Sequence, residues 1–414
     1  MKSILYQRVL PKVVLVVHLL FPAYQHYASG SDPVWHNLSS KRGEIPPPPG
    51  GSTQQTAAVV ADFDKDGTND FILGFRQKPP ALVWYRRTRQ GWDLYIIEKG
   101  FLTIEAGGAV CDIDRDGDLD VVFGGDWQSN EVWWWENPFP DFHRDVPWKR
   151  RAVKRTGRNQ HHDQCFADFL GLGWPQLAFW NQQARALFLA DIPRNPREES
   201  DWPITVVMAD PNRTTTPYPE GLSSFDIDAD GKADLLAYNS WYKHTSGKTF
   251  RQTRICESGG LILAAHFKKS KYPQIVISPG DGNGRLMFYE CNGNPENPVD
   301  WHGRDLIGRE VIRGHSLQLG DINLDGHLDI FCAEMAKWSE GRQEPDHPDA
   351  TAWILYGDGS GNFRTSILIT GHGWHEARLA DLDGDGDLDL LNKPYNWDTP
   401  RVDIWINGLI TPAK

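Results

Sequence analysis

Several features are scarce in this chain of 414 residues, and each scarcity excludes some classes of protein fold or function. Only 4 methionines stand beside 18 tryptophans and 39 glycines, a balance that favours β-structure with many turns over a helical bundle. No basic block occurs, and 43 lysines and arginines against 55 aspartates and glutamates leave a net charge of −12. Because this field would repel phosphate, we expect no nucleic-acid partner.

Cysteine is also scarce. The five cysteines are scattered without CxxC spacing, and an odd number cannot all pair within one chain. The sequence allows one disulfide without assigning it, and we expect most of the cysteines to be buried small hydrophobic residues. They are Cys111, Cys165, Cys256, Cys291 and Cys332.

Long apolar runs are missing except near the N-terminus. Lys2, Arg8 and Lys12 precede an apolar run over residues 13–21, and small and polar residues follow to Gly30. This order predicts a secretory signal peptide over residues 1–30, with export to an extracellular or periplasmic location. An uncleaved anchor is the alternative, but the run is short and His18 interrupts it. We expect no membrane span in the mature chain, residues 31–414.

What the chain has in abundance is a repeated acidic motif, DxDxDGxxD, each copy followed by a short β-prone run. Two further stretches, 168–176 and 266–274, keep the frame while losing most or all of the acids. Successive copies begin 40 to 60 residues apart, the size of a four-stranded propeller blade. The five acidic copies are residues 62–70, 112–120, 226–234, 321–329 and 381–389.

A second pattern fixes the number of blades. An aromatic residue followed by a β-like run closes six repeats, while the seventh such run, at Trp35, precedes the first acidic loop. In a closed ring the N-terminal strand would complete the last blade and remove the open sheet edges. We therefore predict an all-β fold, a single seven-bladed β-propeller of four-stranded blades over residues 31–414. An elongated β-solenoid is the alternative.

The acidic loops predict calcium. Carboxylates at positions 1, 3, 5 and 9 can surround one hard cation, and the glycine permits the sharp turn. Metal-free Asx-rich turns are the alternative, but four clustered carboxylates without a cation repel one another. We expect about five structural calcium ions and none in repeats three and five. The predicted ligands are Asp62, Asp64, Asp66, Asp70, Asp112, Asp114, Asp116, Asp120, Asp226, Asp228, Asp230, Asp234, Asp321, Asn323, Asp325, Asp329, Asp381, Asp383, Asp385 and Asp389.

A candidate site lies at the other end of the innermost strands. The position six residues before each loop should begin the strand beside the central channel, and three histidines and a glutamate among its seven occupants are unexpected for a structural layer. Glu376 adjoins one of the histidines. The seven occupants are Thr56, Ala106, His162, Glu220, Gly260, His315 and His375.

The segments that follow each second strand return to the same face and are rich in aromatic and polar groups. Such groups suit a carbohydrate, which stacks on aromatic faces and hydrogen-bonds to amides and charged side chains. The alternative is that these tryptophans pack between blades. The predicted binding residues are Arg76, Trp127, Asn181, Trp241, Trp338 and Trp397, with Lys393 and Tyr395 nearby.

Two chemistries fit these residues, and both suit β-elimination from a sugar. In one, His162, His315 and His375 hold a transition metal such as zinc, with Glu220 or Glu376. In the other, which needs no metal, a histidine or Tyr395 acts as base, and Lys393 or Arg76 neutralises a developing enolate.

The acidic loops resemble those of the FG-GAP repeat family, also called VCBS or integrin α-type repeats. The segments HHDQCFADF, GHSLQLGDINLDG and GHGWHEARLADLDGDGDLDLLNKPYNWDTPR resemble the propeller domain of the aldos-2-ulose dehydratase group and related secreted bacterial proteins. That resemblance implies dehydration of keto sugars, with a site at His162, His315, His375 and Glu376 and with Lys393 and Tyr395 at its rim. The fungal dehydratases continue into cupin domains whereas this sequence ends at Lys414, so we do not expect an isomerase step.

The sequence thus predicts a secreted, calcium-stabilised propeller that acts on carbohydrate, a carbon–oxygen lyase on a keto sugar or a uronate glycan. The alternative is a non-catalytic lectin-like or adhesion propeller, and a purely stabilising scaffold is a third reading. We favour the enzyme because blades one, two and five lack an ionisable ring residue. Such an asymmetric ring suits one central substrate better than several equivalent ligands.

Overall fold

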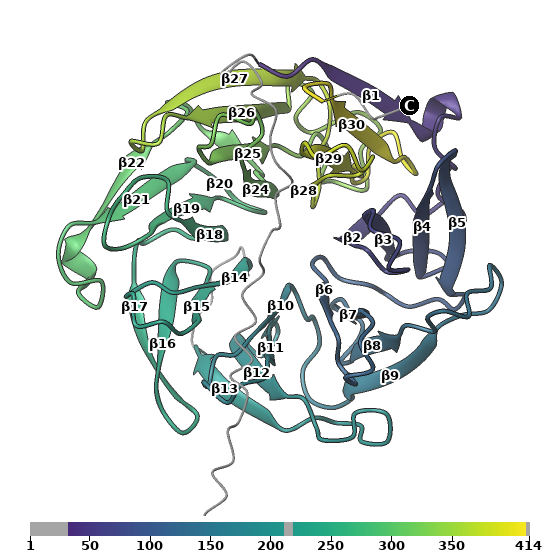
Figure 1. The fold of residues 1–414 in the computed structure, drawn as a ribbon, viewed down its shortest axis with the longest axis horizontal. Coiled ribbons are helices and arrows are strands. Elements are labelled where there is room, and N and C mark those ends of the chain that lie inside the picture. The colour runs from purple at the N-terminus through teal and green to yellow at the C-terminus, as the bar shows by residue number, and fades with distance from the viewer. Residues whose placement is uncertain (1–31, 211–217, 411–414) are drawn as a thin grey trace, which may run out of the picture.

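Each repeat of the sequence folds into one antiparallel sheet whose first two strands flank the repeated loop. In the first blade, the loop at residues 62–70 joins β2 (Gln55–Ala61) to β3 (Asp70–Phe75), and β4 (Leu82–Thr88) and β5 (Gly91–Glu98) complete the sheet in sequence order. The computed structural model describes residues 32–210 and 218–410, and within them seven such four-stranded sheets surround a central axis (Figure 1). The predicted seven-bladed propeller is confirmed.

Blades two to six repeat this order from the axis outward. Blade two contains β6 (Ala109–Cys111), β7 (Asp120–Gly124), β8 (Val132–Glu136) and β9 (Lys149–Lys154), and blade three contains β10 (Gln164–Ala167), β11 (Gln176–Asn181), β12 (Ala186–Asp191) and β13 (Ile204–Ala209). Blade four contains β14 (Leu222–Phe225), β15 (Asp234–Ala237), β16 (Ser240–Ser246) and β17 (Thr249–Arg254). Blade five contains β18 (Leu261–Ala265), β19 (Gln274–Ser278), β21 (Met287–Cys291) and β22 (Trp301–Asp305), and blade six contains β24 (Ser316–Gly320), β25 (Asp329–Ala333), β26 (Thr351–Gly357) and β27 (Phe363–Thr370).

The seventh blade closes the ring with strands from both ends of the described chain. β28 (Arg378–Ala380), β29 (Asp389–Asn392) and β30 (Asp403–Asn407) are followed outward by β1 (Trp35–Ser39), so that purple β1 lies beside yellow β30 in Figure 1. The two outer strands pair antiparallel over five residues, from Trp35 opposite Asn407 to Ser39 opposite Asp403. This is the closure that the displaced Trp35 repeat predicts.

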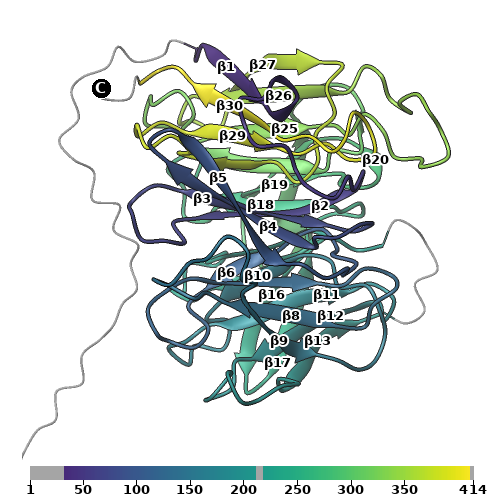
Figure 2. The same cartoon turned by 90° about the vertical axis from the view of Figure 1, so that its right-hand side faces the viewer.

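The core lies between the blades. Because both faces of a blade are covered by neighbours, its second strand is a continuous apolar run, and every residue of β3 is buried. Outer strands are less buried, and β13 exposes every second residue at its start. One cluster between blades one and seven joins Phe71 and Tyr85 to Leu391 and Ile404, and the Phe71 and Tyr85 rings stack with centroids 4.6 Å apart. Figure 2 shows the ring edge-on.

Other elements in the described chain are few. Two 3₁₀ turns, η1 (Ser40–Arg42) and η2 (Pro298–Asp300), lie at the periphery, and β20 (Asn283–Gly284) pairs with β23 (Val311–Ile312) in a two-stranded sheet. None of the described helices has the length and apolar character needed to cross a membrane. All five cysteines are described; each is a free thiol, and Cys332 alone is fully buried. The predicted signal peptide lies outside the described residues.

Ring closure makes a direct prediction. Deleting the chain through Ser39 should lower the thermal midpoint and cause concentration-dependent aggregation, because it bares the backbone groups of β30. With each lost hydrogen bond worth about 1 kcal/mol, we expect a loss of at least about 3 kcal/mol. Calorimetry and size-exclusion chromatography measure both effects. A chain that begins at Asp32 is the control, and equal midpoints for the two chains would contradict the closure role of β1.

Candidate functional site

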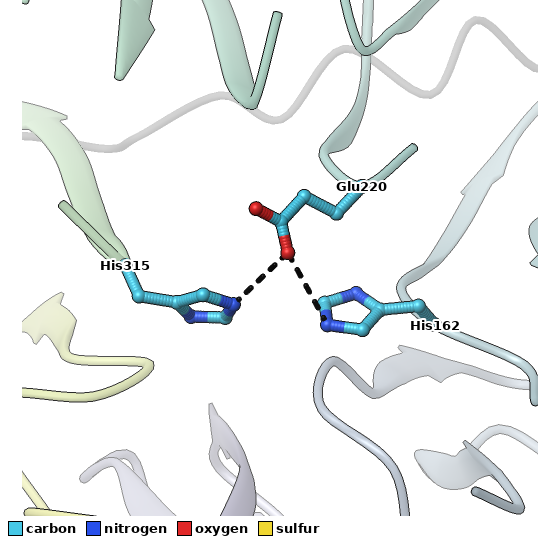
Figure 3. A group of neighbouring side chains, drawn as sticks. All are labelled: His162, Glu220 and His315. Atoms are coloured by element: carbon cyan, nitrogen blue, oxygen red, sulfur yellow. Dashed lines mark hydrogen bonds and ion pairs between the residues drawn. The ribbon is translucent and has the colours of Figure 1, made fainter. Parts of the chain in front are cut away.

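The seven ring positions lie at or just before the starts of the innermost strands, at the end of the channel opposite the acidic loops. Three of them converge: the Glu220 carboxylate lies between the rings of His162 and His315 (Figure 3). Glu220 Oε2 is 3.3 Å from Nε2 of His315 and 3.6 Å from Nε2 of His162. All three side chains are buried. Their ligand atoms lie within 4.8 Å of one another, which suits a shared cation.

A carboxylate lies behind each of the two imidazoles, and the one behind His162 is within hydrogen-bond distance. Nδ1 of His162 is 2.8 Å from Asp163 Oδ2, so its Nε2 faces Glu220. Asp163 also accepts a 2.6 Å hydrogen bond from the backbone N–H of Gly221. Nδ1 of His315 is 3.4 Å from Glu376, which in turn accepts a 2.6 Å hydrogen bond from Arg378. Carboxylates behind imidazoles in this way orient metal ligands in proteins.

The charges of this cluster are strongly coupled. Burial by itself would lower the pKa of both imidazoles, but the surrounding carboxylates raise the pKa of His162 to about 10 and that of His315 to about 9. Burial would raise the pKa of Glu220, yet the two histidines lower it. A buried carboxylate between two imidazoles therefore attracts positive charge, supplied by protons or by a metal ion.

His375 lies beside this group rather than within it. Its ring stacks on His315 with centroids 4.6 Å apart and on Tyr395 at 4.9 Å. Its Nδ1 is 3.0 Å from Lys393 Nζ, and burial together with the Lys393 charge lowers the pKa of His375 well below its usual value. His375 is therefore neutral and does not face the Glu220 carboxylate with the other two histidines.

Lys393 does not occupy the predicted rim position. It is fully buried, and its Nζ donates to the backbone carbonyls of Gln55, Thr56 and His375 at 3.0 to 3.1 Å. These three carbonyls and Nδ1 of His375 surround Nζ, so no N–H of Lys393 is left for a substrate, and burial lowers the pKa of Lys393 well below its usual value. Lys393 thus supports the start of β2 and the His375 ring and does not line the cavity, and its role in neutralising a substrate enolate stays a prediction.

The layer formed by His162, His315 and His375, called the histidine layer below, lines one side of a cavity of about 790 Å³. Two tryptophans stand in its wall with much of their surface in solvent, Trp127 at 45% and Trp338 at 36%. An arginine lies over each ring, Arg76 over Trp127 at 5.1 Å and Arg313 over Trp338 at 4.8 Å. Besides these four residues, the wall includes Glu105, Gln160, His162, Gln182, Tyr218, Asp281, His315, Glu340, His375 and Tyr395.

The two arginines differ in their partners. Arg76 forms an ion pair with Glu105, lies 3.5 Å from Asp126, and donates a 3.1 Å hydrogen bond to the Tyr395 hydroxyl. Its charge is therefore compensated within the wall. Arg313 lies 3.8 Å from Asp346, outside hydrogen-bond distance.

Three of the predicted binding residues do not reach this cavity. Trp241 is fully buried between blades four and five, and its Nε1 donates to the Pro295 carbonyl at 3.1 Å. Asn181 is fully buried, with its amide bonded to Arg158 and His161. Trp397 is half-buried under Lys337, outside the wall. The second and third strands bury Trp241 and Asn181 among the blades, so the structure does not bring these two predicted binding residues to the cavity.

Asp281 and Arg313 are wall residues that the repeat alignment misses. Asp281 lies between the second and third strands of blade five and Arg313 between blades five and six, both outside the strands that the seven-fold frame compares. The run Pro279–Gly282 carries a turn signal that could have drawn attention to Asp281.

At the opposite face, the acidic loops gather their carboxylates. The first, third and fifth positions lie within 4.8 Å of one another in the loops that begin at Asp62, Asp112, Asp226 and Asp381. In the loop at residues 321–329, the Asn323 amide donates to Asp325 at 2.9 Å. Within the described chain, several of these buried oxygens have no hydrogen-bond partner: Asp112 Oδ1, Asp228 Oδ1 and Asp385 Oδ2. Oxygens without partners fit a hard cation.

The ninth aspartate of each loop is tied to the backbone. Asp389, for example, accepts 2.8 Å hydrogen bonds from the N–H groups of Leu382 and Asn407, which links the loop to the third strand of the blade. Burial raises the pKa of these carboxyls, to about 8 at Asp70, Asp120 and Asp389 and to about 7 at Asp234 and Asp329. The ninth position remains a predicted ligand, with this structural role in addition.

Residues 321–391 match the family model of the FG-GAP-like repeat. This segment runs from the acidic loop of blade six into β29 of blade seven. No curated protein matches the chain. The finer resemblance to the aldos-2-ulose dehydratase group stays a prediction.

Solved structures that resemble the chain are propeller proteins. The rhamnogalacturonan lyase YesW is 14% identical, with 91% of this chain and 76% of that chain covered at a TM-score of 0.50. BBS1N in complex with ARL6DN is 10% identical, with 91% and 98% covered at 0.53. YCF48 from Cyanidioschyzon merolae is 10% identical, with 90% and 98% covered at 0.50. At such identities the likeness shows the fold alone.

In blades three and five, a glutamine side chain replaces the ninth aspartate of the acidic loops. Gln176 and Gln274 occupy the ninth position, and each accepts a 3.0 Å hydrogen bond from the backbone near the start of its loop. The amide of each also donates to the carbonyl of the seventh position, at 2.8 Å for Trp174 and 3.1 Å for Tyr272. An N–H donor therefore meets the carbonyl that a cation would bind in the acidic loops.

Blade five also reverses a charge pair. In blades one and four, a basic residue of the third strand pairs with the aspartate at the third loop position: Arg86 with Asp64 and Lys243 with Asp228. In blade five, Lys268 takes the third position and pairs with Glu290 of β21. The lysine ammonium brings its own positive charge to this loop.

The glutamine bridge can be tested with Gln274→Asp. The substitution removes the amide donor to Tyr272 and buries a carboxylate in a loop without acids at positions 1, 3 and 5, so we expect a loss of about 1–3 kcal/mol. Urea unfolding measures it. Added calcium should not restore the stability, and Gln274→Glu, which keeps the length but also lacks the donor, should behave alike. Full stability of both variants would show that the bridge is dispensable.

Proposed function

We propose that this protein is an exported, calcium-stabilised propeller that acts on carbohydrate as a carbon–oxygen lyase, at the His162–Glu220–His315 cluster. The observation that carries the proposal is the convergence of these three ligand atoms beneath a 790 Å³ cavity with two exposed tryptophans in its wall. Aromatic faces beside charged and amide groups suit a sugar. The fold shared with YesW is compatible with this chemistry but does not carry it.

The residues present fit a divalent transition metal. Two neutral imidazoles and one carboxylate are a common ligand set for zinc, and Asp163 and Glu376 lie behind the imidazoles. A metal bound there would polarise a substrate carbonyl and stabilise the negative charge that builds up when an α proton is removed. His162, Glu220 and His315 would hold it, while Trp127 and Trp338 would contact the sugar.

Tyr395 can carry a proton in this reaction. Its hydroxyl faces the cavity and accepts a hydrogen bond from Arg76, and burial raises the pKa of the phenol to about 12 despite this charge. Tyr395 therefore keeps its proton at neutral pH. It can donate that proton to the oxygen that departs in the elimination, while neutral His375, which also lines the cavity, would accept the α proton.

Mutation of the cluster tests the proposal. With keto sugars and uronate glycans as candidate substrates, the protein should form unsaturated products that absorb in the near ultraviolet, and His315→Ala should reduce this rate at least about 100-fold. Circular dichroism checks the fold. His302→Ala, an exposed histidine of β22, is the control. Saturable sugar binding without turnover in the wild-type protein would instead establish a non-catalytic binding module.

We further infer that calcium occupies the five acidic loops and acts on stability. The unpaired buried oxygens and clustered carboxylates support this, and the glutamine bridges of blades three and five explain how those blades fold without it. Ions at these loops tie the first two strands of a blade together and lie at the opposite end of the channel from the histidine layer.

Chelation should therefore destabilise the protein. At a free calcium concentration 100 times Kd, binding contributes about 2.7 kcal/mol per site, so we expect EDTA to lower the thermal midpoint and calcium to restore it.

Without calcium, the folded chain retains protons at Asp120 and Asp389 up to about pH 8, whereas unfolded aspartates lose them near pH 4. Stability in EDTA should thus fall as pH rises between these values. Calorimetry at pH 5.5 and 8.5 measures this, and an EDTA-insensitive midpoint would refute the calcium assignment.

A further inference from the structure

Asp281 lies beside the histidine layer although it is not one of the seven aligned ring positions. It lies in the turn between β19 and β20, where the N–H of Gly282 donates to the Pro279 carbonyl at 3.1 Å. Its Oδ1 is 3.5 Å from Nε2 of His315, and its backbone N–H donates to the Glu220 carboxylate. Its side chain is a quarter exposed and lines the cavity.

Two glycines make room for this turn. The ring position of blade five is Gly260, where a Cβ would collide with the Ser278 carbonyl and lie 2.7 Å from the carbonyl carbon of Pro279. Gly280 has a φ of +60°, and a Cβ there would overlap the Glu220 carboxylate. The absent side chain at Gly260 is therefore replaced in the layer by Asp281 from the following turn.

The turn is fixed to the segment that carries His315. β20 pairs with β23, and the N–H of Arg313 donates to the Gly282 carbonyl at 2.9 Å. On the other side of the turn, the Ser278 hydroxyl donates to the Gly314 carbonyl at 2.6 Å. These bonds hold Asp281 and His315 in one rigid unit, so their separation does not depend on a flexible loop.

The Asp281 carboxylate lacks a partner of its own. Its Oδ1 is buried and has no hydrogen-bond partner among the described residues, although it lies 3.5 Å from an imidazole nitrogen of His315, and burial together with the charge of Glu220 raises the pKa of Asp281. Two adjacent carboxylates repel each other unless a positive charge lies between them. Metal–ligand bonds of about 2.0–2.2 Å put neighbouring ligand atoms roughly 3 to 3.5 Å apart. His315 Nε2 is 3.3 Å from Glu220 and 3.5 Å from Asp281, and His162 Nε2 is 3.6 Å from Glu220, all close to that range. Asp281 is not in the group of three whose ligand atoms all lie within 4.8 Å of one another, so its carboxylate would bind the ion by a movement of its side chain.

We propose that Asp281 is a fourth ligand, so that His162, Glu220, Asp281 and His315, from four consecutive blades, hold one divalent transition-metal ion. This inference rests on the metal of the proposed function and adds a ligand to it. The two carboxylates balance the charge of a divalent ion. Asp281 is also the most exposed of the four, with a side chain 25% exposed against 5% or less for the others, so substrate meets the ion on the Asp281 side.

Metal affinity tests the assignment without any substrate. The full chain, stripped of transition metal and kept in calcium, is titrated calorimetrically with Zn²⁺. Asp281→Asn should weaken binding at least about 10-fold, because an uncharged amide is a poor ligand and leaves the ion with one carboxylate. Asp145→Asn, the same change at an exposed aspartate, should bind as the wild type does.

Asp281→Cys gives a positive signal that does not depend on lost affinity. With Co²⁺ in place of zinc, a thiolate at this position should produce the near-ultraviolet charge-transfer band of a cobalt–sulfur bond, which the wild-type protein with its five native thiols should lack. Absence of the band in a folded Asp281→Cys protein, or unchanged Zn²⁺ affinity in Asp281→Asn, would overturn the assignment of Asp281 alone. Failure of the wild-type protein to bind Zn²⁺ would remove the metal of the proposed function as well.

Discussion

The structure depends on the pairing of β1 with β30, which turns a row of seven sheets into a closed ring. Without closure each terminal blade would expose a sheet edge and one apolar face. With it, every blade is covered on both sides, which is why second strands such as β3 are buried throughout. Closure also aims the first strands at one axis. Residues about 60 to 95 positions apart, such as Glu220 and its partners, therefore meet at the channel.

Clustered negative charge is the second constraint, and it arises at both ends of the channel. In four of the five acidic loops, carboxylates at three positions lie within 4.8 Å of one another, and at the other end Glu220 lies between two imidazoles. Blades three and five show that the loop can be built without this charge, by a glutamine that joins the loop start to the seventh carbonyl. Because two blades build the loop with this bridge, the turn itself does not require the acids.

The candidate site is built from positions at which the seven repeats differ in sequence. The frame places equivalent residues in one layer, but each blade contributes differently: a histidine from blades three, six and seven, a glutamate from blade four, and a glycine from blade five. The glycine matters because the turn of Pro279–Gly282 fills its place. Blades one and two supply the opposite wall, where Arg76 is compensated by Glu105 and supports Trp127. The outcome is one asymmetric cavity.

The sequence by itself determined the period, the seven blades, the closing strand and the layer in which His162, Glu220 and His315 meet, because repeats in register constrain positions that recur. It did not determine the depth of side chains outside that register. Lys393 and Trp241 looked accessible beside loops, yet packing between blades buries both. Asp281 was invisible, since its partners lie 61 and 34 residues away on other blades. Only closure of the ring and the turn over Gly260 bring these groups together, and such contacts leave no periodic trace along the chain.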